Sequence, residues 1–319
     1  MAWCIGIDEA GYGPNLGPLV MTAVACRVPD RLCGGNLWRT LKKAVRRPGD
    51  DDDGRILVED SKALFSQAEG LAVLETSVLA ILSGVCSTSI TLQHFLDSVC
   101  PGMVDELRQE TWFRGSTPLP LASTPQSIEA AAGLFVAACA DGEIFLERVR
   151  SVVVCPPRFN AMIERWGSKG GVLSHGLAEL LRWNLSFQDD AGVFVTVDKH
   201  GGRNHYSAVL QEAIEEGFVI AREEGALRSE YEVMGSPRPI RIRFEPRADG
   251  SHFCVALASM VSKYLREVLM HEFNAFWQMH LPGLKATAGY PGDASRFFDE
   301  IAPVLTKLAI AKEKIWRCR

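Results

Sequence analysis

Runs of apolar residues predict a series of strands along the chain. Residues 3–8 are apolar and end in acid, which indicates a buried strand, and residues 19–28 (LVMTAVACRV) are rich in small and β-branched residues and predict its partner. Residues 192–198 (GVFVTVD) predict a further strand that ends in an acid. A strand bounded by prolines is expected at 151–155 (SVVVC), and the alternation of apolar and basic residues at 240–245 (IRIRFE) predicts a strand with one solvent-facing side.

Helical spacing of apolar residues predicts the elements between these strands. Leucine and valine recur at this spacing from about 66 to 83, residues 172–186 are expected to be helical, and the stretch after Asp249 (HFCVALASMVSKYLREVLMHEFNAFW) has the strongest helical pattern in the chain. Residues 48–54 (PGDDDDG) have no periodicity and predict an exposed linker. Strands that alternate with helices predict an α/β fold.

Composition narrows the class of protein. The chain has 319 residues, of which 47% are hydrophobic and 23% charged, as is ordinary for a globular protein. The absence of a long apolar run and of a signal-peptide pattern predicts a cytoplasmic protein that does not bind a membrane. The net charge of −5 argues mildly against an extended nucleic-acid surface, although it allows a local basic groove beside an acidic metal site. No CxxC pair occurs, so a zinc site is not expected.

Acidic residues occupy similar places at the ends of predicted elements. Asp8 and Glu9 end the first strand, Asp198 ends the strand at 192–198, and Asp249 precedes the long helix. Neighbouring side chains on a strand point to opposite faces, so Asp8 and Glu9 can serve one site only if the chain twists there, which the following glycines permit. Clustered carboxylates repel unless cations bind them, and oxygen ligands favour Mg²⁺ or Mn²⁺. The alternative is a set of solvated loop acids, with Asp249 as a helix N-cap.

Four short segments match segments of a known protein family in amino-acid sequence and in their order along the chain. Residues 6–18 read GIDEAGYGPNLGP, residues 59–64 read EDSKAL, residues 247–267 read RADGSHFCVALASMVSKYLRE, and residues 289–291 read GYP. They resemble the type 2 ribonuclease H family (ribonuclease HII), whose corresponding segments are GIDEAGRGPLAGP, a DSK motif, KADAKSxSIAAASIxAKVTRD and a GYPT or GYGT turn. The third segment aligns with that of the family without a gap.

The resemblance implies a fold and an activity. It implies a ribonuclease H-like mixed sheet flanked by helices, as one catalytic domain over residues 1–319. Residues 84–148 have no counterpart in the family and are expected to be an insertion, and a C-terminal helical region is expected at about 255–319. The implied enzyme is an endoribonuclease that hydrolyses the RNA strand of RNA–DNA hybrids, or ribonucleotides embedded in duplex DNA, and leaves 5′-phosphate and 3′-hydroxyl ends.

The resemblance also assigns the acids. Asp8 and Glu9 match the first two metal-binding acids of the family, and Asp249 matches the acid before its long helix. Asp198 matches by context alone, because the VDKHGG sequence around it is not the usual one. These four residues are therefore the predicted catalytic residues and the predicted ligands of two Mg²⁺ or Mn²⁺ ions, which would form a clamp for phosphodiester displacement.

The loop after the first acids departs from the family pattern. The family has Gly-Arg-Gly or Gly-Lys-Gly here, and its backbone touches the ribose 2′-hydroxyl while its cation meets a phosphate. This chain has Gly11-Tyr12-Gly13, which keeps the glycines and lacks the charge. Arg203, in the glycine-containing loop KHGGRNHY that follows Asp198, is the candidate for the missing phosphate contact.

Other candidate substrate contacts are also carried over from the family. Lys62 and Lys263 occupy family lysine positions and are candidate phosphate contacts, although Lys62 could be a solvated surface residue and Lys263 a lysine at the edge of the core. Tyr290 matches the tyrosine that stacks on a sugar. The last residues, KLAIAKEKIWRCR, carry five basic residues and one acid, and are expected either to follow a duplex backbone or to form a solvated helix face.

Two residue types near these motifs are given a structural interpretation. Ser259 is expected to be a helix-packing residue. His200, His205 and His252 are interpreted as structural, because no two of them have clear metal-ligand spacing.

Three functions are therefore compatible with the sequence. One is a two-metal ribonuclease H, a second is a related metal-dependent nuclease with an altered substrate preference, and a third is a non-catalytic nucleic-acid-binding homologue. The presence of all four acids disfavours the third function. The missing loop cation keeps the second open.

Overall fold

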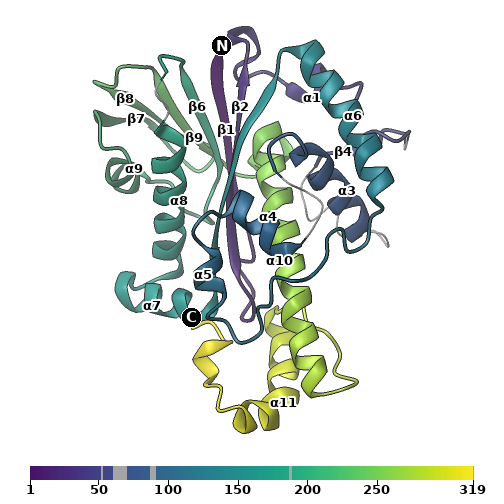
Figure 1. Cartoon of the computed structure of the whole chain (residues 1–319). Helices are drawn as coiled ribbons and strands as arrows, with labels where there is room; N and C mark the ends of the chain where they lie inside the picture. Colours follow the sequence, from purple (N-terminus) through teal and green to yellow (C-terminus); the bar gives the residue numbers. More distant parts are fainter. Residues whose placement is uncertain (52, 60–69, 87–90, 187–188, 319) are drawn as a thin grey trace.

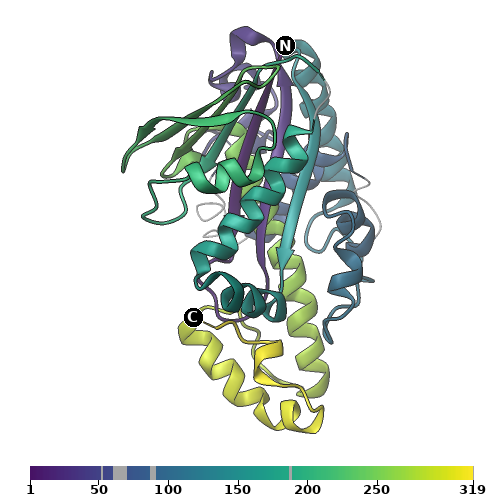
Figure 2. The same ribbon diagram turned by 90° about the vertical axis from the view of Figure 1, so that its left-hand side faces the viewer.

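A mixed sheet of seven strands forms the centre of the molecule, and helices cover both of its faces (Figure 1, Figure 2). This computed structural model of the chain describes residues 1–51, 53–59, 70–86, 91–186 and 189–318. The strands are β1 (Ala2–Ala10), β2 (Leu19–Val28), β5 (Phe145–Val154), β6 (Val193–Asp198), β7 (Phe218–Glu224), β8 (Ser229–Met234) and β9 (Ile240–Glu245). Their order in the sheet is β5-β2-β1-β6-β9-β8-β7. The predicted α/β class is confirmed.

The strand β1 lies between one antiparallel and one parallel neighbour. It runs antiparallel to β2 and parallel to β6, with Ile7 opposite Val197, and β9 continues the parallel part of the sheet beyond β6. Carboxyl ends of adjacent parallel strands lie at the same edge of a sheet, where α/β proteins commonly place their sites. The ends of β1 and β6 are therefore neighbours.

Two layers of helices pack on the sheet and form an apolar core on each face. The first layer is built around α10, which contacts β1 and β2, and the second is built around α8 with α7 and α9. Ile5 and Ile7 of β1 belong to the core under α8, so the alternate residues Cys4, Gly6 and Asp8 face α10. The helices are α1 (Leu37–Thr40), α3 (Gly70–Leu82), α4 (Leu92–Val99), α5 (Val104–Leu107), α6 (Pro125–Gly142), α7 (Pro156–Trp166), α8 (Lys169–Leu185), α9 (Ser207–Ala213), α10 (Phe253–His280) and α11 (Pro291–Lys307).

Gly6 allows α10 to lie directly against β1. A Cβ atom at this position would lie 2.1 Å from the carbonyl carbon of Cys254 and 2.2 Å from the backbone nitrogen of Val255. Both are backbone atoms, so no side-chain rotation can relieve the clash. The close contact fixes the distance between the helix and the strand that carries Asp8.

The substitution Gly6→Ala is expected to lower the free energy of unfolding by about 1–3 kcal/mol, because the helix must move away from the sheet. Urea denaturation measures this change. The matched control is Gly133→Ala in α6, where a Cβ atom meets nothing within 4 Å, and which should be stabilising by roughly 0.5–1 kcal/mol. Equal urea midpoints for Gly6→Ala and the wild-type protein would contradict the prediction.

Most predicted elements are present close to their expected bounds. The strands β2 and β9 begin and end where the apolar pattern placed them. The helix α3 covers the described part of the stretch predicted at 66–83, and α8 and α10 correspond to the other two predicted helices. The described part of 48–54 is an exposed turn that links β3 (Val45–Arg46) to β4 (Ile56–Leu57), a separate pair of short strands.

The sheet is larger than the sequence pattern indicates. The strand β5 begins at Phe145 instead of 151, because the added half alternates exposed and partly buried side chains and so lacks a continuous apolar run. The hairpin of β7 and β8 was not predicted. The strand β7 reads FVIAREE and lies at the edge of the sheet, where its side chains are mostly exposed. Its apolar and polar residues therefore do not alternate in the way that predicts a strand.

The segment predicted as an insertion forms part of the core beside α10. It supplies α4, α5 and α6, and its buried side chains, including Phe95, Trp112 and Phe135, belong to the same apolar cluster as α10. That residues 84–148 are an insertion relative to the family stays a prediction.

The C-terminal helical region expected at about 255–319 contains most of α10 and all of α11, but its last described residues are not helical. After α11 and a short 3₁₀ turn, η3 (Lys312–Lys314), the chain is extended, and Trp316 forms a β-bridge with Leu16. Asn160 of α7 holds this segment, since it donates to the carbonyls of Glu313 and Trp316 at 3.1 and 2.9 Å. The expectation that the last residues form a solvated helix face is therefore wrong for the described part of this segment, because these tertiary contacts override the local pattern.

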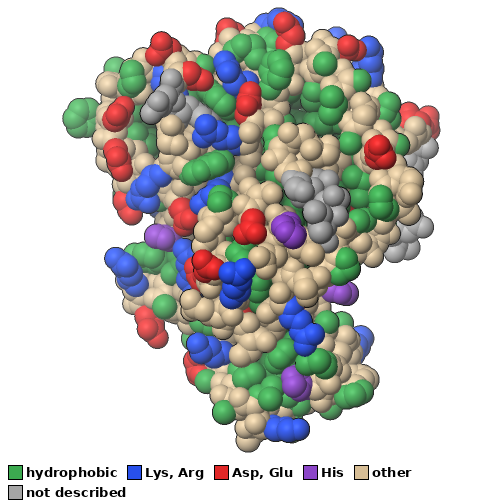
Figure 3. All heavy atoms as spheres, in the orientation of Figure 1, with side chains coloured by type: hydrophobic (Ala, Val, Ile, Leu, Met, Phe, Trp, Pro, Cys, Tyr) green, Lys and Arg blue, Asp and Glu red, His purple; other side chains and the backbone are tan. Residues whose placement is uncertain are grey.

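The surface carries charges of both signs. On the face shown in Figure 3, basic and acidic side chains are interspersed, in keeping with the small net charge of −5. Among the described residues, no helix is both long and apolar enough to cross a membrane.

Candidate functional site

A pocket at the carboxyl ends of β1 and β6 brings the four predicted acids together. It also contains the Gly11-Tyr12-Gly13 loop and part of α10. Of the predicted substrate contacts, Lys263 and Tyr290 lie in its wall, whereas Lys62 lies outside the described residues. The lining residues are Asp8, Glu9, Ala10, Gly11, Tyr12, Gly13, Asp198, Asp249, Ser259, Lys263, Arg266, Glu267, Ala288 and Tyr290.

Three separate elements carry the acids into the pocket. Because Ile7 pairs with Val197, Asp8 and Asp198 occupy neighbouring positions at the ends of two parallel strands. Asp249 lies in η2 (Ala248–Gly250), the short 3₁₀ turn before α10. The backbone nitrogen of Ala248 donates to Asp198 Oδ1 at 2.8 Å, which ties this turn to the end of β6.

The pKa of Asp8 is strongly shifted by its surroundings in the pocket. Its side chain is buried, and burial raises its pKa well above the ordinary value, with the charges of Glu9, Asp198 and Asp249 acting in the same direction. A hydrogen bond from the hydroxyl of Ser259 opposes this shift by stabilising the charged form. Ser259 is buried in α10, as expected of a packing residue, and it also contacts Asp8.

The donor set matches a hard divalent cation in its chemistry. The four acids supply only oxygen ligands. The negative charges of Glu9, Asp198 and Asp249 raise the pKa of Asp8, and a bound cation would relieve this repulsion. In the part of the chain that the structure describes, however, no three His, Cys, Asp or Glu side chains form a group that could hold a metal ion. The carboxylates instead accept backbone hydrogen bonds, such as that from Gly250 to Asp249 at 2.9 Å and from Glu9 to Asp8 at 2.7 Å. Metal binding by the four acids stays a prediction.

The Gly11-Tyr12-Gly13 loop is fixed at Gly11 by close packing and by a hydrogen bond from a buried arginine. Gly11 has a φ of +88°, and a Cβ atom there would lie 2.5 Å from Arg266 Nε and 2.7 Å from the carbonyl oxygen of Pro18, so the position requires glycine. The buried Arg317 donates to the Gly11 carbonyl at 2.5 Å. The loop therefore has little freedom where it borders the acids.

A lysine from another element approaches Tyr12. The ammonium of Lys169, the first residue of α8, lies 5.9 Å from the centroid of the Tyr12 ring, within the range of a cation–π contact. Tyr12 itself is 36% exposed, and burial and the charge of Glu9 raise its pKa. A positive charge thus lies near position 12, although the loop does not supply it.

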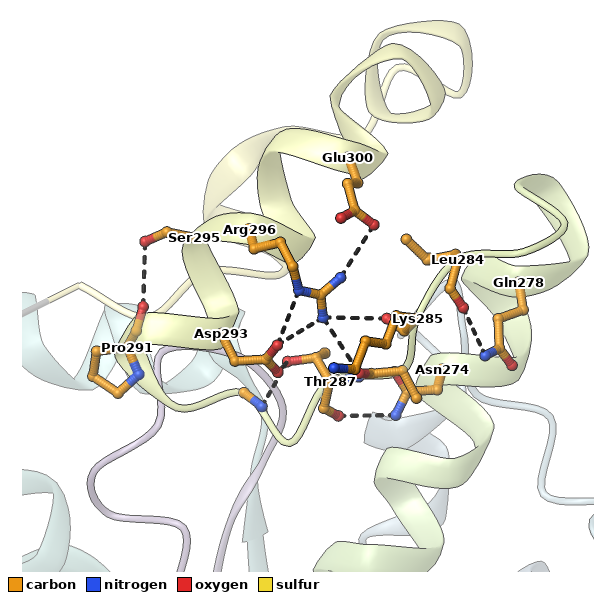
Figure 4. Close-up of polar contacts among 12 residues, drawn as sticks. Asn274, Gln278, Leu284, Lys285, Thr287, Pro291, Asp293, Ser295, Arg296 and Glu300 are labelled. Carbon is orange, nitrogen blue, oxygen red and sulfur yellow. Dashed lines mark hydrogen bonds and ion pairs between the residues drawn. The ribbon is translucent and has the colours of Figure 1, made fainter.

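Tyr290 lies at the rim of the pocket, on a turn that several hydrogen bonds stabilise. Its side chain is 50% exposed. Gly289 before it has a φ of +83° and accepts a hydrogen bond from the backbone of Asn15 at 2.8 Å, so this turn packs against the loop that follows Gly13. Figure 4 shows the network behind the turn, in which Arg296 binds Asp293 and Asp293 accepts from the hydroxyl of Thr287.

The other predicted cations have partners within the protein. Lys263 donates to Glu267 at 2.6 Å along α10. Arg203 donates to Ser174 of α8 at 2.5 Å and to the carbonyl of His205 at 2.8 Å, and it is not among the residues that line the pocket. The structure therefore does not place Arg203 beside Tyr12, because its side chain turns toward α8.

Arg266 and Glu267 of the pocket wall, and two residues that contact the loop, were not singled out by the sequence analysis. Glu267 follows Ser259 and Lys263 at intervals of four along α10, so a polar stripe on an otherwise apolar helix was the available signal for it. Lys169 and Arg317 reach the loop from distant parts of the chain, and no local pattern marks them.

Comparisons with known proteins agree with the resemblance over a limited stretch. No family model matches the chain. A stretch of 68 residues is 41% identical to ribonuclease HII of Geobacillus kaustophilus (strain HTA426), and it makes up 21% of this chain and 20% of that protein. The match thus spans about a fifth of the length of this curated relative. The predicted resemblance to the type 2 ribonuclease H family is confirmed at this level.

Solved structures resemble the chain over nearly its whole length. The crystal structure of ribonuclease H2 from Pyrococcus horikoshii OT3 has a TM-score of 0.50 and 13% identity, over 98% of this chain and 92% of that one. Ribonuclease HII from Archaeoglobus fulgidus, in a complex with PCNA, has a TM-score of 0.46 and 16% identity, over 99% and 94% of the two chains. The first likeness shows that the chain has a ribonuclease H-like fold, as predicted.

Proposed function

We propose that this chain is a metal-dependent endoribonuclease of the ribonuclease H type. Its substrate would be the RNA strand of an RNA–DNA hybrid, or a ribonucleotide embedded in duplex DNA. The observation that carries the proposal is the meeting of Asp8, Glu9, Asp198 and Asp249 in one pocket at the carboxyl ends of parallel strands. The stretch similar to a protein named ribonuclease HII supports the same reaction.

The four acids would hold two Mg²⁺ or Mn²⁺ ions. When bound, the ions would supply activation of the attacking water and stabilisation of charge on the leaving 3′ oxygen, which gives 5′-phosphate and 3′-hydroxyl ends. Asp8, which is buried among the other three acids, would be a ligand whose negative charge the ions stabilise. The Ser259 hydroxyl would keep the Asp8 carboxylate oriented and charged.

The loop and the rim would recognise the substrate. Gly13, where a Cβ atom would meet nothing closer than 3.9 Å, leaves the backbone of the loop open to a close approach by a ribose, and contact with the ribose 2′-hydroxyl is how a protein distinguishes RNA from DNA. Gly11 would hold the loop in the conformation that this contact needs. Tyr290, half exposed at the rim, would stack on a sugar. Lys263 would face a phosphate from its place in the wall of the pocket.

Lys169, whose ammonium lies near Tyr12, is a second candidate for the phosphate contact that the loop does not supply. In that role, Lys169→Met is expected to weaken binding of a ribonucleotide-containing duplex by about 3- to 10-fold, and to reduce the slope of log K against log salt by about 1, as for the loss of one phosphate contact. Fluorescence anisotropy at several salt concentrations measures both quantities. Lys43→Met is the matched control, because Lys43 is an exposed lysine paired with Asp141. Arg203→Met tests the other candidate, and a loss of affinity in Arg203→Met but not in Lys169→Met would assign the contact to Arg203.

The decisive experiment is a cleavage assay on a DNA duplex that contains one ribonucleotide. Cleavage is expected with Mg²⁺ or Mn²⁺, should cease with EDTA, and should be absent on the same duplex made only of DNA. A protein that binds metal and cleaves only single-stranded or structured nucleic acid would instead be a nuclease with an altered preference, which the uncharged Tyr12 favours. A protein that binds no divalent metal would be a non-catalytic homologue.

A further inference from the structure

A buried histidine, His200, lies beside Glu9 of the acid pocket. His200 follows Asp198 by two residues, and it is 7% exposed. Neither of its ring nitrogens has a hydrogen-bond partner within the described part of the chain. Buried polar side chains in folded proteins nearly always have such a partner, so an exception of this kind calls for a functional explanation.

The surroundings of His200 hold its ring in one place. Its backbone nitrogen donates to the hydroxyl of Tyr206 at 3.2 Å, and the two rings meet edge to face with centroids 6.1 Å apart. The ring nitrogen Nε2 lies 3.9 Å from Oε2 of Glu9. That separation exceeds a hydrogen bond by less than one ångström, so a small rotation of the Glu9 carboxylate would join the two groups.

We propose that His200 is a positioning residue, which donates a hydrogen bond from Nε2 to Glu9 and orients this carboxylate for metal binding. The inference rests on the proposed function, because Glu9 is one of the proposed ligands. A carboxylate that binds a metal with one oxygen leaves the other for an outer hydrogen bond, and such outer partners set the orientation of the ligand.

The direction in which Glu9 leaves β1 places it on the same side of the sheet as His200. Neighbouring side chains on a strand point to opposite faces, and Asp8 faces α10, where Ser259 contacts it. Glu9 therefore leaves β1 on the side of α8, the side on which Tyr206 and the core beneath α8 lie. His200 comes from the end of β6 on this side, so each of the two adjacent acids has a support on its own face of the sheet.

The test compares two substitutions by their effect on metal binding alone. His200→Phe keeps a ring against Tyr206 and removes the donor, whereas His200→Gln keeps an N–H donor at a similar reach. Titration with Mn²⁺, followed by the electron paramagnetic resonance signal of the free ion, measures affinity without substrate. We expect His200→Phe to lower Mn²⁺ affinity by about 10- to 100-fold, and His200→Gln to stay close to the wild-type protein.

The outcomes separate this inference from the proposed function. If the wild-type protein binds Mn²⁺ and His200→Phe binds it equally well, the positioning role is wrong and the proposed function stands. The same holds if His200→Gln loses as much affinity as His200→Phe. A wild-type protein that binds no Mn²⁺ would overturn both. Should His200→Phe fail to fold, His200→Met provides a smaller side chain without a donor for the same titration.

Discussion

Replacing Asp8 by asparagine is expected to lower the rate of cleavage by about 10³-fold or more, while it stabilises the metal-free protein. The loss of activity follows because a metal clamp supplies several kcal/mol of transition-state stabilisation, and each 1.4 kcal/mol is about a factor of ten in rate. The gain in stability follows because burial and three neighbouring carboxylates disfavour the charged form of Asp8. Asparagine has nearly the same shape and no charge.

The sign of the pH dependence follows from the raised pKa of Asp8. In the folded, metal-free protein this carboxyl keeps its proton at a pH at which the unfolded chain has lost it. The corresponding stability is fully present below the unfolded pKa and is lost as the pH rises through the folded pKa. In EDTA, the wild-type protein should therefore lose stability as the pH rises through that window, and Asp8→Asn should lose less.

Thermal unfolding in EDTA across this pH range measures the stability, and the cleavage assay with Mg²⁺ measures the activity. The control is Asp141→Asn, because Asp141 is an exposed acid that pairs only with Lys43 among its ion-pair contacts in the described residues. It should cost about 0–1 kcal/mol and leave cleavage unchanged. An Asp8→Asn variant that is less stable than the wild-type protein in EDTA at neutral pH would show that charge repulsion does not dominate at this residue.

Replacing Arg317 by methionine is expected to lower the free energy of unfolding by about 3–5 kcal/mol and to weaken substrate binding. Arg317 is fully buried, and its guanidinium donates to the Gly17 carbonyl at 2.8 and 2.5 Å and to the Gly11 carbonyl at 2.5 Å. Each carbonyl that is left buried without a donor costs about 1–3 kcal/mol, and methionine can satisfy neither. Gly11 belongs to the proposed substrate-binding loop, so the loss of this hydrogen bond should make the loop less ordered. The expected consequence is a raised KM.

Urea denaturation and steady-state cleavage measure the two effects. Lys314→Met is the matched control, because Lys314 is an exposed basic residue in the same terminal segment, and its loss should change stability by no more than about 0.5 kcal/mol. If Arg317→Met unfolds at the same urea concentration as Lys314→Met, the terminal segment does not support the loop. A stability loss without a change in KM would limit the role of Arg317 to folding.

The strands and the long helix were predictable where burial is periodic. The strands β2 and β9 match their predicted bounds because one or both of their faces are buried, so apolar residues follow the backbone geometry. The β7–β8 hairpin was missed for the opposite reason. The strand β7 is exposed at the sheet edge, and a strand that buries few side chains leaves no apolar pattern to recognise.

The end of the chain shows the limit of local pattern more clearly. The segment KLAIAKEKIWRCR has a helix-like composition, yet it ends in an extended stretch with a buried arginine. The groups that hold it are the side chain of Asn160 and the carbonyls of Gly11 and Gly17, far away in the sequence. Hydrogen bonds between distant segments cannot be read from the spacing of residues within one of them.

The sequence by itself determined the class of fold, the positions of the four acids at the ends of predicted elements, and the missing cation at Tyr12, because each of these depends on residues that are neighbours along the chain. Only the tertiary structure decided which groups surround those residues. It placed Ser259 on Asp8, His200 beside Glu9 and Lys169 near Tyr12, and it turned Arg203 toward α8. Contacts of this kind arise where separate elements pack together, and so they follow from the arrangement of the sheet and its helices rather than from any local pattern.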